Sequence, residues 1–459
     1  MSDVLSLGIL RRQAEAEAEH LAYFDALSGL ANRRLLIDRT SHELASAQRQ
    51  GTCGALLFFD LDHFKNINDA MGHTRGDFLP QQVANRLRQR IRADDTLARL
   101  GGDEFVVLIP ASFNDDDRAC FHARLLAEEL RLDLALPYTL EGGEHHLTAS
   151  VGIALYPSDA ENAEELLRHA DAAMYAAKAD GRDSVRRYQP IMQDNANARL
   201  KLNTDLRQAL ECDELELHFQ PKLDHNQSLT GAEALLRWQH PKRGLILPEV
   251  FIRLAEESGM ILPIGEWVLR EACQLLNRCP EEIRSNPQFH FAVNVSPLQF
   301  QQRDFADVVT RILSQSGADP KRIILEITEG ALALDVESAI RKIHQLKELG
   351  LKLAIDDFGT GYSSLARLKQ LSLNSLKIDR SFVSGLPDDR NDTAIVDTIL
   401  AMAHRMSLSV TAEGVENQKQ WRYLVDKGCR SFQGYLFSRP LPLREFVQFC
   451  KTQQTASSG

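Results

Sequence analysis

The distribution of apolar and polar residues divides the chain into successive regions. Apolar residues recur at steps of three and four within residues 1–24, which predicts an N-terminal helix. Residues 25–188 mix helical periodicity with short apolar strands, the pattern of an α+β domain. A polar stretch without a sustained period, residues 189–199, is the expected linker. Regular alternation of strands and helices follows over residues 200–452, and residues 453–459 are expected to form a disordered tail.

The α+β region is expected to contain helices and strands in mixed order. The helices are predicted at 33–50, 77–92, 117–132 and 161–179, and the strands at 55–60, 96–100, 105–109 and 147–156. Two of these strands meet at Gly101-Gly102, which predicts a β-hairpin because glycine tolerates the positive φ of a tight turn.

The region after the linker has the pattern of a closed α/β fold. Strand candidates end near Phe219, Leu235, Val295, Ile327, Ile355, Ile378, Ala412 and Phe432, with helical stretches between most of them. Eight strands with intervening helices predict a TIM-like (β/α)₈ barrel. Barrels of this kind carry their chemistry at the carboxyl ends of the strands.

The N-terminal helix has two interpretations. Its apolar spacing suits a short coiled-coil stalk that joins two copies of the chain, or a helix that packs on its own domain. Because the helix begins almost at the first residue, we expect an upstream sensory domain that is absent from this chain.

Charge and composition limit the classes of partner. Acidic residues outnumber basic ones by 64 to 53, so neither a nucleic-acid polymer nor an anionic membrane surface is an expected partner. An anionic substrate must be held locally, by metal or by a few cations. The seven cysteines include no C-x-x-C pair, and no apolar run approaches the ~18 residues of a membrane span. We therefore expect a cytoplasmic protein, or the cytosolic part of a larger, membrane-anchored one.

Polar side chains stand at seven of the predicted strand ends of the barrel. These residues are Glu233, Asn294, Glu326, Asp356 with Asp357, Lys377, Glu413 and Gln433. Oxygen ligands in such number, without His or Cys, suit Mg²⁺ or Mn²⁺ better than zinc. Two such ions about 3.5–4 Å apart could clamp the attacking and leaving oxygens of a phosphoester hydrolysis.

The same strand ends carry a family resemblance. The segments EALLRW (233–238), NVSP (294–297), LEITE (325–329), DDFGTGYSSL (356–365), LKIDRSF (376–382), AEGVE (412–416) and FQGYLFSRPL (432–441) resemble the EAL family of cyclic di-GMP phosphodiesterases. The implied reaction is hydrolysis of one phosphodiester bond of cyclic di-GMP, which yields linear pGpG.

The resemblance assigns roles to individual residues. It implies that two Mg²⁺ or Mn²⁺ ions are held by Glu233, Asn294, Glu326, Asp356 and Asp357, with Glu413 as metal ligand, general base or both. It also implies that Lys377 positions the attacking water, Glu329 fixes the segment 356–365, Gln433 supports the water network, and Gln220 and Arg237 contact the dinucleotide. Lys222 departs from the pattern, because an apolar residue is common there. We expect Lys222 to tune the rim of the site without removing activity.

The predicted hairpin of the first half presents a second set of acids. Asp103 and Glu104 lie at its tip, and Asp60 ends a buried strand, so the three carboxylates could meet across the sheet. Such a group could bind metal and activate a hydroxyl for attack on a triphosphate.

These acids also lie within motifs of a known family. The segments DALSGLANRR (25–34), DLDHFKNINDAMGHTRGD (60–77), RLGGDEF (99–105), SVGIALYP (150–157) and YAAKADGR (175–182) resemble the GGDEF family of diguanylate cyclases, which have a palm-like antiparallel sheet with helices. The resemblance implies one or two metal ions on Asp60, Asp103, Glu104 and the Leu61 carbonyl, guanine contacts by Asn68 and Asp77, triphosphate contacts by Lys65, Lys178 and Arg182, and a product-inhibition site at Arg92 and Asp95.

The sequence is compatible with three functions. The chain could both make and hydrolyse cyclic di-GMP, it could be a phosphodiesterase whose first domain only senses GTP, or it could be a silent cyclic di-GMP receptor. Each GGDEF domain binds one GTP, so synthesis requires two domains face to face in a homodimer. Hydrolysis needs no such alignment, and we expect it to be the net activity.

Overall fold

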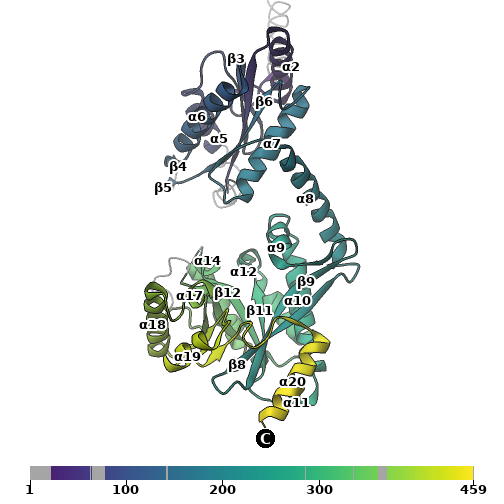
Figure 1. Ribbon diagram of the computed structural model, residues 1–459, viewed down its shortest axis with the longest axis vertical. Coiled ribbons are helices and arrows are strands. Elements are labelled where there is room, and N and C mark those ends of the chain that lie inside the picture. The colour runs from purple at the N-terminus through teal and green to yellow at the C-terminus, as the bar shows by residue number, and fades with distance from the viewer. Residues whose placement is uncertain are drawn as a thin grey trace, which may run out of the picture. The chain divides into compact units, whose positions relative to one another are not determined.

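The computed structural model describes residues 22–62, 64, 78–140, 143–284, 286–333, 335–359 and 370–457 (Figure 1). The chain divides into two compact units, Met1–Leu200 and Lys201–Gly459. The predicted N-terminal helix lies almost entirely outside the described residues. None of the helices that the structure describes is long and apolar enough to cross a membrane.

The first unit is built on a five-stranded sheet in the order β2-β3-β1-β6-β7. The pairs are antiparallel except β6 with β7. The strands are β1 (Cys53–Leu61), β2 (Thr96–Gly101), β3 (Glu104–Phe113), β6 (Ala149–Tyr156) and β7 (Val185–Arg187), and β4 (Tyr138–Leu140) pairs separately with β5 (Gly143–His145).

Helices cover both faces of this sheet, which explains why β1 and β6 are continuous apolar runs. Leu57 and Phe59 of β1 pack with α5 (Phe78–Arg88) and α6 (Asp116–Leu134), whereas Leu56 and Phe58 pack with α2 (Arg33–Gln50) and α7 (Ala163–Ala179). The predicted α+β domain is confirmed. Strands β4, β5 and β7 were not predicted, because three residues are too few to show a period.

The second unit contains a closed barrel of eight strands. The strands are β8 (Leu215–Asp224), β9 (Leu229–His240), β11 (His290–Val295), β12 (Ile323–Thr328), β13 (Lys352–Phe358), β14 (Ser375–Ile378), β15 (Ser409–Ala412) and β16 (Ser431–Phe432). Strand β8 pairs with both β9 and β16 and closes the ring. Two short strands, β10 (Gly244–Ile246) and β17 (Leu441–Pro442), pair with β9 and β8.

The predicted TIM-like barrel is confirmed, with one difference in strand direction. Strand β8 runs antiparallel to both of its neighbours in the barrel. The other seven barrel strands, β9 and β11 to β16, are each parallel to the next. The connection between β8 and β9 contains only residues 225–228. Four residues can form a hairpin turn but are too few for a crossover helix, so the first strand cannot be parallel to the second.

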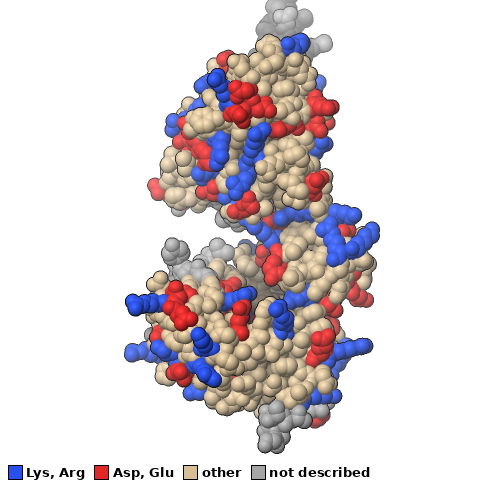
Figure 2. All heavy atoms as spheres, viewed as in Figure 1, with Lys and Arg blue, Asp and Glu red and all other residues tan. Residues whose placement is uncertain are grey.

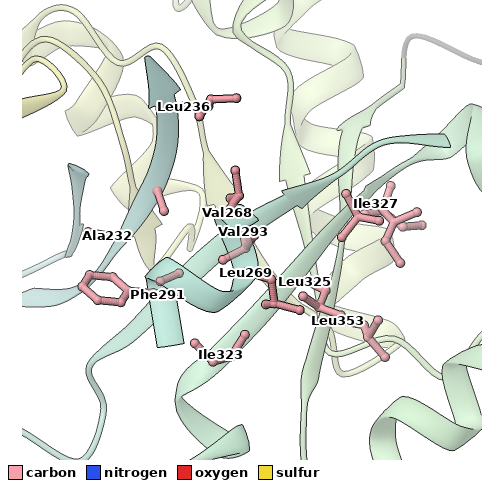
Figure 3. Close-up of a cluster of buried hydrophobic side chains, with 14 of the residues drawn as sticks. Ala232, Leu236, Val268, Leu269, Phe291, Val293, Ile323, Leu325, Ile327 and Leu353 are labelled. Atoms are coloured by element: carbon pink, nitrogen blue, oxygen red, sulfur yellow. The ribbon is translucent and has the colours of Figure 1, made fainter. Parts of the chain in front are cut away.

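Helices surround the barrel and cover the apolar outer faces of its strands. They are α9 (Pro248–Glu257), α10 (Ile261–Arg278), α11 (Glu281–Arg284), α12 (Pro297–Gln301), α13 (Phe305–Ser316), η1 (Pro320–Arg322), α14 (Glu329–Ala333), α15 (Val336–Glu348), α17 (Arg380–Ser384), α18 (Arg390–Arg405), α19 (Gln418–Asp426) and α20 (Leu443–Ser457). Figure 3 shows Val268 and Leu269 of α10 beside Val293 and Leu325 of the barrel strands. Successive side chains of a strand point to opposite faces, so the residues between these apolar ones face the barrel interior.

Two predicted irregular segments are helical. The expected linker, residues 189–199, lies mostly within α8 (Pro190–Ala209), where proline at the first position is compatible with a helix and Leu202 and Leu206 are buried further on. The expected disordered tail is helical as far as Ser457, because α20 is anchored by buried residues and meets no Gly or Pro before Gly459.

Candidate functional site

The polar strand ends of the second unit meet in the barrel interior around Lys377 of β14. Its ammonium lies 2.6 Å from Glu326 Oε2, 3.3 Å from Glu233 Oε2, 2.9 Å from Asp356 Oδ1 and 2.5 Å from Glu413 Oε1. Burial alone would lower the pKa of Lys377, but these carboxylates raise it well above its usual range. Lys377 therefore remains an ammonium ion in the metal-free site.

Glu233 on β9 is the most strongly hydrogen-bonded of these carboxylates. Asn294 Nδ2 donates to its Oε1 over 2.6 Å, and Gln433 Nε2 donates to its Oε2 over 2.7 Å. Gln433 Nε2 also lies 2.9 Å from Gln220 Oε1, which links β16 to β8. Burial opposes ionisation, but Lys377, Lys222 and these amides hold the pKa of Glu233 at about 2. Glu233 is thus a fixed anion.

Three acids form a compact ligand set at the mouth. Oxygen atoms of Asp356, Asp357 and Glu413 lie within 4.8 Å of one another, and no other described acids, His or Cys form such a group. Burial raises the pKa of Asp357 to about 6 and that of Glu413 to about 8, with repulsion from Asp356 adding to both. The shifts come mainly from burial of carboxylates close to one another, whose charge bound divalent cations would neutralise. Hard oxygen donors are also the ligands that Mg²⁺ and Mn²⁺ prefer, so the residues fit such a pair of ions.

A cavity of about 270 Å³ opens onto Asp356 and Glu413, whereas Asp357 is not among the residues that line it. It is lined by Gln220, Glu233, Leu235, Asn294, Asp356, Lys377, Arg380, Glu413, Gly414, Glu416, Gln433, Gly434 and Tyr435. Sequence analysis did not single out Arg380, Glu416 or Tyr435. Arg380 Nη2 donates to Glu416 Oε1 over 2.7 Å. Both residues lie within the family motifs LKIDRSF and AEGVE, and their charge within these motifs is the signal that was available.

Two further predicted residues of the second unit, Arg237 and Lys222, are both buried. Arg237 is buried, donates to the Leu236 carbonyl and is not among the residues that line the cavity. Lys222 was expected at the rim, but it is 2% exposed, and its Nζ lies 2.5 Å from Glu326 Oε1. The expectation for Lys222 is wrong because alternation along β8 from Gln220 turns position 222 into the barrel.

Glu329 is the first residue of α14 and lies beside the start of the DDFGTGYSSL segment. Its Oε2 accepts a hydrogen bond from Gly359 N over 3.3 Å. This contact agrees with a role in fixing that segment, whose residues 360–365 lie outside the described part of the chain.

The acids of the first unit converge across its central strands. Asp60 of β1 is directly opposite Glu104 of β3, and Leu61 N donates to the Asp103 carbonyl over 3.2 Å. Lys178 Nζ lies 2.6 Å from Asp60 Oδ1. Burial raises the pKa of Asp60 to about 6 despite this ammonium, with Asp103 and Glu104 adding repulsion. The acids therefore share a region that cations would stabilise.

Asp62 is a residue of this site that sequence analysis missed. Its carboxylate is buried and accepts hydrogen bonds from Thr148 Oγ1, Ser150 Oγ and Asp183 N. Arg182 and Asp183 both have positive φ, 65° and 46°, a conformation that costs free energy in non-glycine residues. Asp62 therefore stabilises the turn that carries Arg182. Its partners are remote in the sequence, so no local pattern pointed to it.

Arg92 and Asp95, the predicted product-inhibition pair, form a local turn. Arg92 is exposed, with its Nη2 3.3 Å from His122 Nε2, and its backbone N–H donates to Asp95 Oδ2 over 2.8 Å. The pair therefore closes a turn and leaves the guanidinium at the surface. Lys65, Asn68 and Asp77 lie outside the described residues.

Charges of both signs are mixed on the face of the molecule that Figure 2 draws. Figure 2 shows Lys and Arg interspersed with Asp and Glu over the face in view. An anionic ligand would therefore meet individual cations and not a broad basic patch on this face. Lys178 lies beside Asp60, and Lys377 lies beside Asp356.

The two units correspond to two known domain families. Residues 22–184 match the diguanylate cyclase GGDEF domain, and residues 203–440 match the EAL domain. The chain therefore belongs to the tandem GGDEF–EAL proteins of cyclic di-GMP turnover.

Among similar proteins are two from Pseudomonas aeruginosa. The bifunctional diguanylate cyclase/cyclic di-GMP phosphodiesterase MucR is 44% identical over 97% of this chain, and the cyclic di-GMP phosphodiesterase NbdA is 40% identical over 95%. This chain spans 64% and 55% of the lengths of these two relatives. A solved structure described as "PaMucR Phosphodiesterase, c-di-GMP complex" is 44% identical over 54% of this chain and 99% of its own, with a TM-score of 0.51.

Proposed function

We propose that the EAL unit hydrolyses cyclic di-GMP to linear pGpG in a reaction that depends on Mg²⁺ or Mn²⁺. The observation that carries this proposal is the convergence of four carboxylates on Lys377, which lines an open cavity. The carboxylates belong to Glu233, Asp356 and Glu413, which also line the cavity, and to Glu326. Support also comes from the 44% identity to MucR, whose name includes this activity.

Each residue has a defined task in the proposed reaction. Glu233, Asn294, Glu326, Asp356 and Asp357 would hold two divalent ions, with Glu413 as a further ligand. When bound, such ions supply charge stabilisation at the phosphoryl oxygens and lower the pKa of water. Lys377 orients the attacking water, and Glu413 accepts its proton. Gln220 and Gln433 line the cavity and orient the dinucleotide and water. As the new P–O bond forms, the P–O3′ bond breaks, and the leaving 3′ oxygen ends as a hydroxyl.

Nucleotide separation after incubation with cyclic di-GMP and Mg²⁺ tests this activity. Glu233→Gln and Asp356→Asn should lower turnover at least 100-fold, because a neutral ligand weakens the charge clamp. Glu337→Gln is a matched control, since that side chain is 91% exposed on α15 and should leave turnover unchanged. Near-wild-type turnover in both site variants, with folding confirmed by circular dichroism, would contradict the proposal.

We also propose that the GGDEF unit binds GTP and that two such units, face to face in a homodimer, synthesise cyclic di-GMP. The opposition of Asp60 and Glu104 beside Lys178 supports this proposal, because it places acids for a metal next to a cation for a triphosphate. In the alternative function, GTP bound here only regulates hydrolysis by the EAL unit.

A non-hydrolysable GTP analogue and GTP itself separate these two functions. Synthesis from GTP in a Glu233→Gln background, where product is not destroyed, would establish a cyclase. No synthesis, together with faster hydrolysis when the analogue is added to wild type, would establish a sensor. Lys178→Met should remove either effect, because it removes a proposed triphosphate contact.

A further inference from the structure

Two ammonium groups hold Glu326 on β12, one on each carboxylate oxygen. Lys377 Nζ lies 2.6 Å from Oε2, and Lys222 Nζ lies 2.5 Å from Oε1. The Glu326 side chain is 1% exposed, and both lysine side chains are 3% exposed, so water does not screen either ion pair. The proposed reaction accounts for Lys377 but gives no task to Lys222.

Lys222 approaches Glu326 from beneath the proposed metal ligands. On β8, Gln220 is paired with Glu233 of β9, whereas Lys222 is paired with Gly231. Position 222 is therefore two residues deeper along the same interior face than position 220.

The two lysines differ in their other partners. Lys377 contacts Glu233, Asp356 and Glu413 as well, so a cation bound among these carboxylates would compete with it. Lys222 forms an ion pair with Glu326 alone among the described residues. Its contact is with the opposite oxygen of Glu326, so it can persist when a cation is bound.

We propose that Lys222 is a positioning residue, which holds Glu326 through Oε1 and leaves Oε2 as the oxygen that faces the divalent cations. The inference rests on the proposed function, because it takes Glu326 as a metal ligand. A lysine with this task orients a ligand and does not touch substrate. Removal of such an outer partner weakens metal binding about 10- to 100-fold in other metal sites.

Isothermal titration of the full chain with Mn²⁺ tests the effect on the metal. Lys222→Met keeps the length of the stem and removes the charge, and we expect Mn²⁺ to bind at least tenfold more weakly at the EAL site. A lysine that only repelled the cation would give the opposite result, tighter Mn²⁺ binding after the substitution. The first unit is identical in all variants, so any Mn²⁺ bound there is a constant background.

Lys342→Met is a matched control. Lys342 is also buried in this unit, 7% exposed, but its Nζ donates to the Phe300 carbonyl over 2.6 Å, and no carboxylate of the site is its partner. We expect this variant to lose stability without any change in Mn²⁺ affinity.

A double-mutant cycle in chelator gives a second readout that does not depend on activity or metal. Lys222→Met should lower the thermal unfolding temperature in the wild-type background and should lower it much less when Glu326→Gln is also present. If Lys222→Met alone fails to fold while the double variant folds, the coupling is equally established. Additive losses, or a double variant that also fails to fold, would show that Lys222 only fills space and would overturn the proposal.

The outcomes also separate this inference from the proposed function. If wild type binds Mn²⁺ and hydrolyses cyclic di-GMP, but Lys222→Met binds Mn²⁺ as wild type does or more tightly, the positioning role is wrong and the function stands. If wild type neither binds Mn²⁺ at this unit nor hydrolyses the dinucleotide, both are wrong.

Discussion

Lys377 of β14 and Asp356 of β13 meet inside the barrel, with Nζ 2.9 Å from Oδ1. Their strands are neighbours, and Leu376 is paired with Ile355, so the two polar residues that follow occupy the same level of the barrel interior. Three further carboxylates reach the same ammonium from β9, from β12 and from the residue after β15. Lys377 is therefore the ammonium that these four carboxylates share, whereas Lys222 pairs with Glu326 alone among them.

Lys377→Met should destabilise the metal-free protein by about 3–5 kcal/mol, because it leaves buried carboxylates without their shared cation. Mg²⁺ should restore part of this loss by supplying positive charge to the same oxygens. Chemical denaturation with and without Mg²⁺ measures both effects, and an equal loss in the two conditions would show that the lysine acts only through packing. Hydrolysis should be lost in either case.

Ca²⁺ should inhibit hydrolysis in competition with Mg²⁺. The larger ion accepts more ligands in a looser geometry and would place the attacking water poorly. The check is the rate of pGpG formation at fixed Mg²⁺ and increasing Ca²⁺. Full activity with Ca²⁺ alone would argue against a reaction that depends on tight ligand geometry.

His290 should make the second unit sensitive to mild acid. Burial, with the Lys222 ammonium adding to it, lowers the pKa of His290 to about 4, whereas an unfolded histidine titrates near 6.5. The neutral ring is therefore favoured in the folded state, and its contribution is complete above about pH 6.5. As pH falls from about 6.5 to about 4, up to about 3 kcal/mol of stability is lost.

Calorimetric unfolding of wild type and His290→Gln at pH 7.5 and pH 5 measures this dependence. Wild type should lose more stability between the two values than the variant does. Parallel losses in both proteins would assign the acid sensitivity to other groups.

Arg92→Ala should relieve product inhibition of any cyclase activity. The Arg92 guanidinium is exposed and could bind a guanine or phosphate with two parallel hydrogen bonds, whereas Asp95 also closes the local turn through the Arg92 N–H. Arg92→Ala is therefore a cleaner test than a change at Asp95. The test compares Glu233→Gln with the double variant Glu233→Gln/Arg92→Ala. GTP turnover should stop early in the first and continue in the second. Identical progress curves for the two proteins would show that Arg92 and Asp95 take no part in product inhibition.

Much of the fold could be predicted because its elements are long and periodic. Helix α2 covers the predicted residues 33–50, and β1 contains the predicted strand 55–60. The direction of β8 could not be predicted from periodicity, which is the same for parallel and antiparallel strands. It depends on the short connection to β9. The helical segments α8 and the end of α20 were missed because polar helices have little apolar period.

The sequence by itself determined which acids, amides and cations stand at strand ends, because alternation and motif spacing are local properties. It also determined the family, through motifs such as EALLRW and RLGGDEF. Only the tertiary structure decided that Lys222 faces Glu326 inside the barrel and that Asp62 supports the turn at Arg182. These contacts join residues 104 and 121 positions apart. They are set by strand register and barrel closure, which depend on the packing of the whole unit and leave no signal in the local sequence.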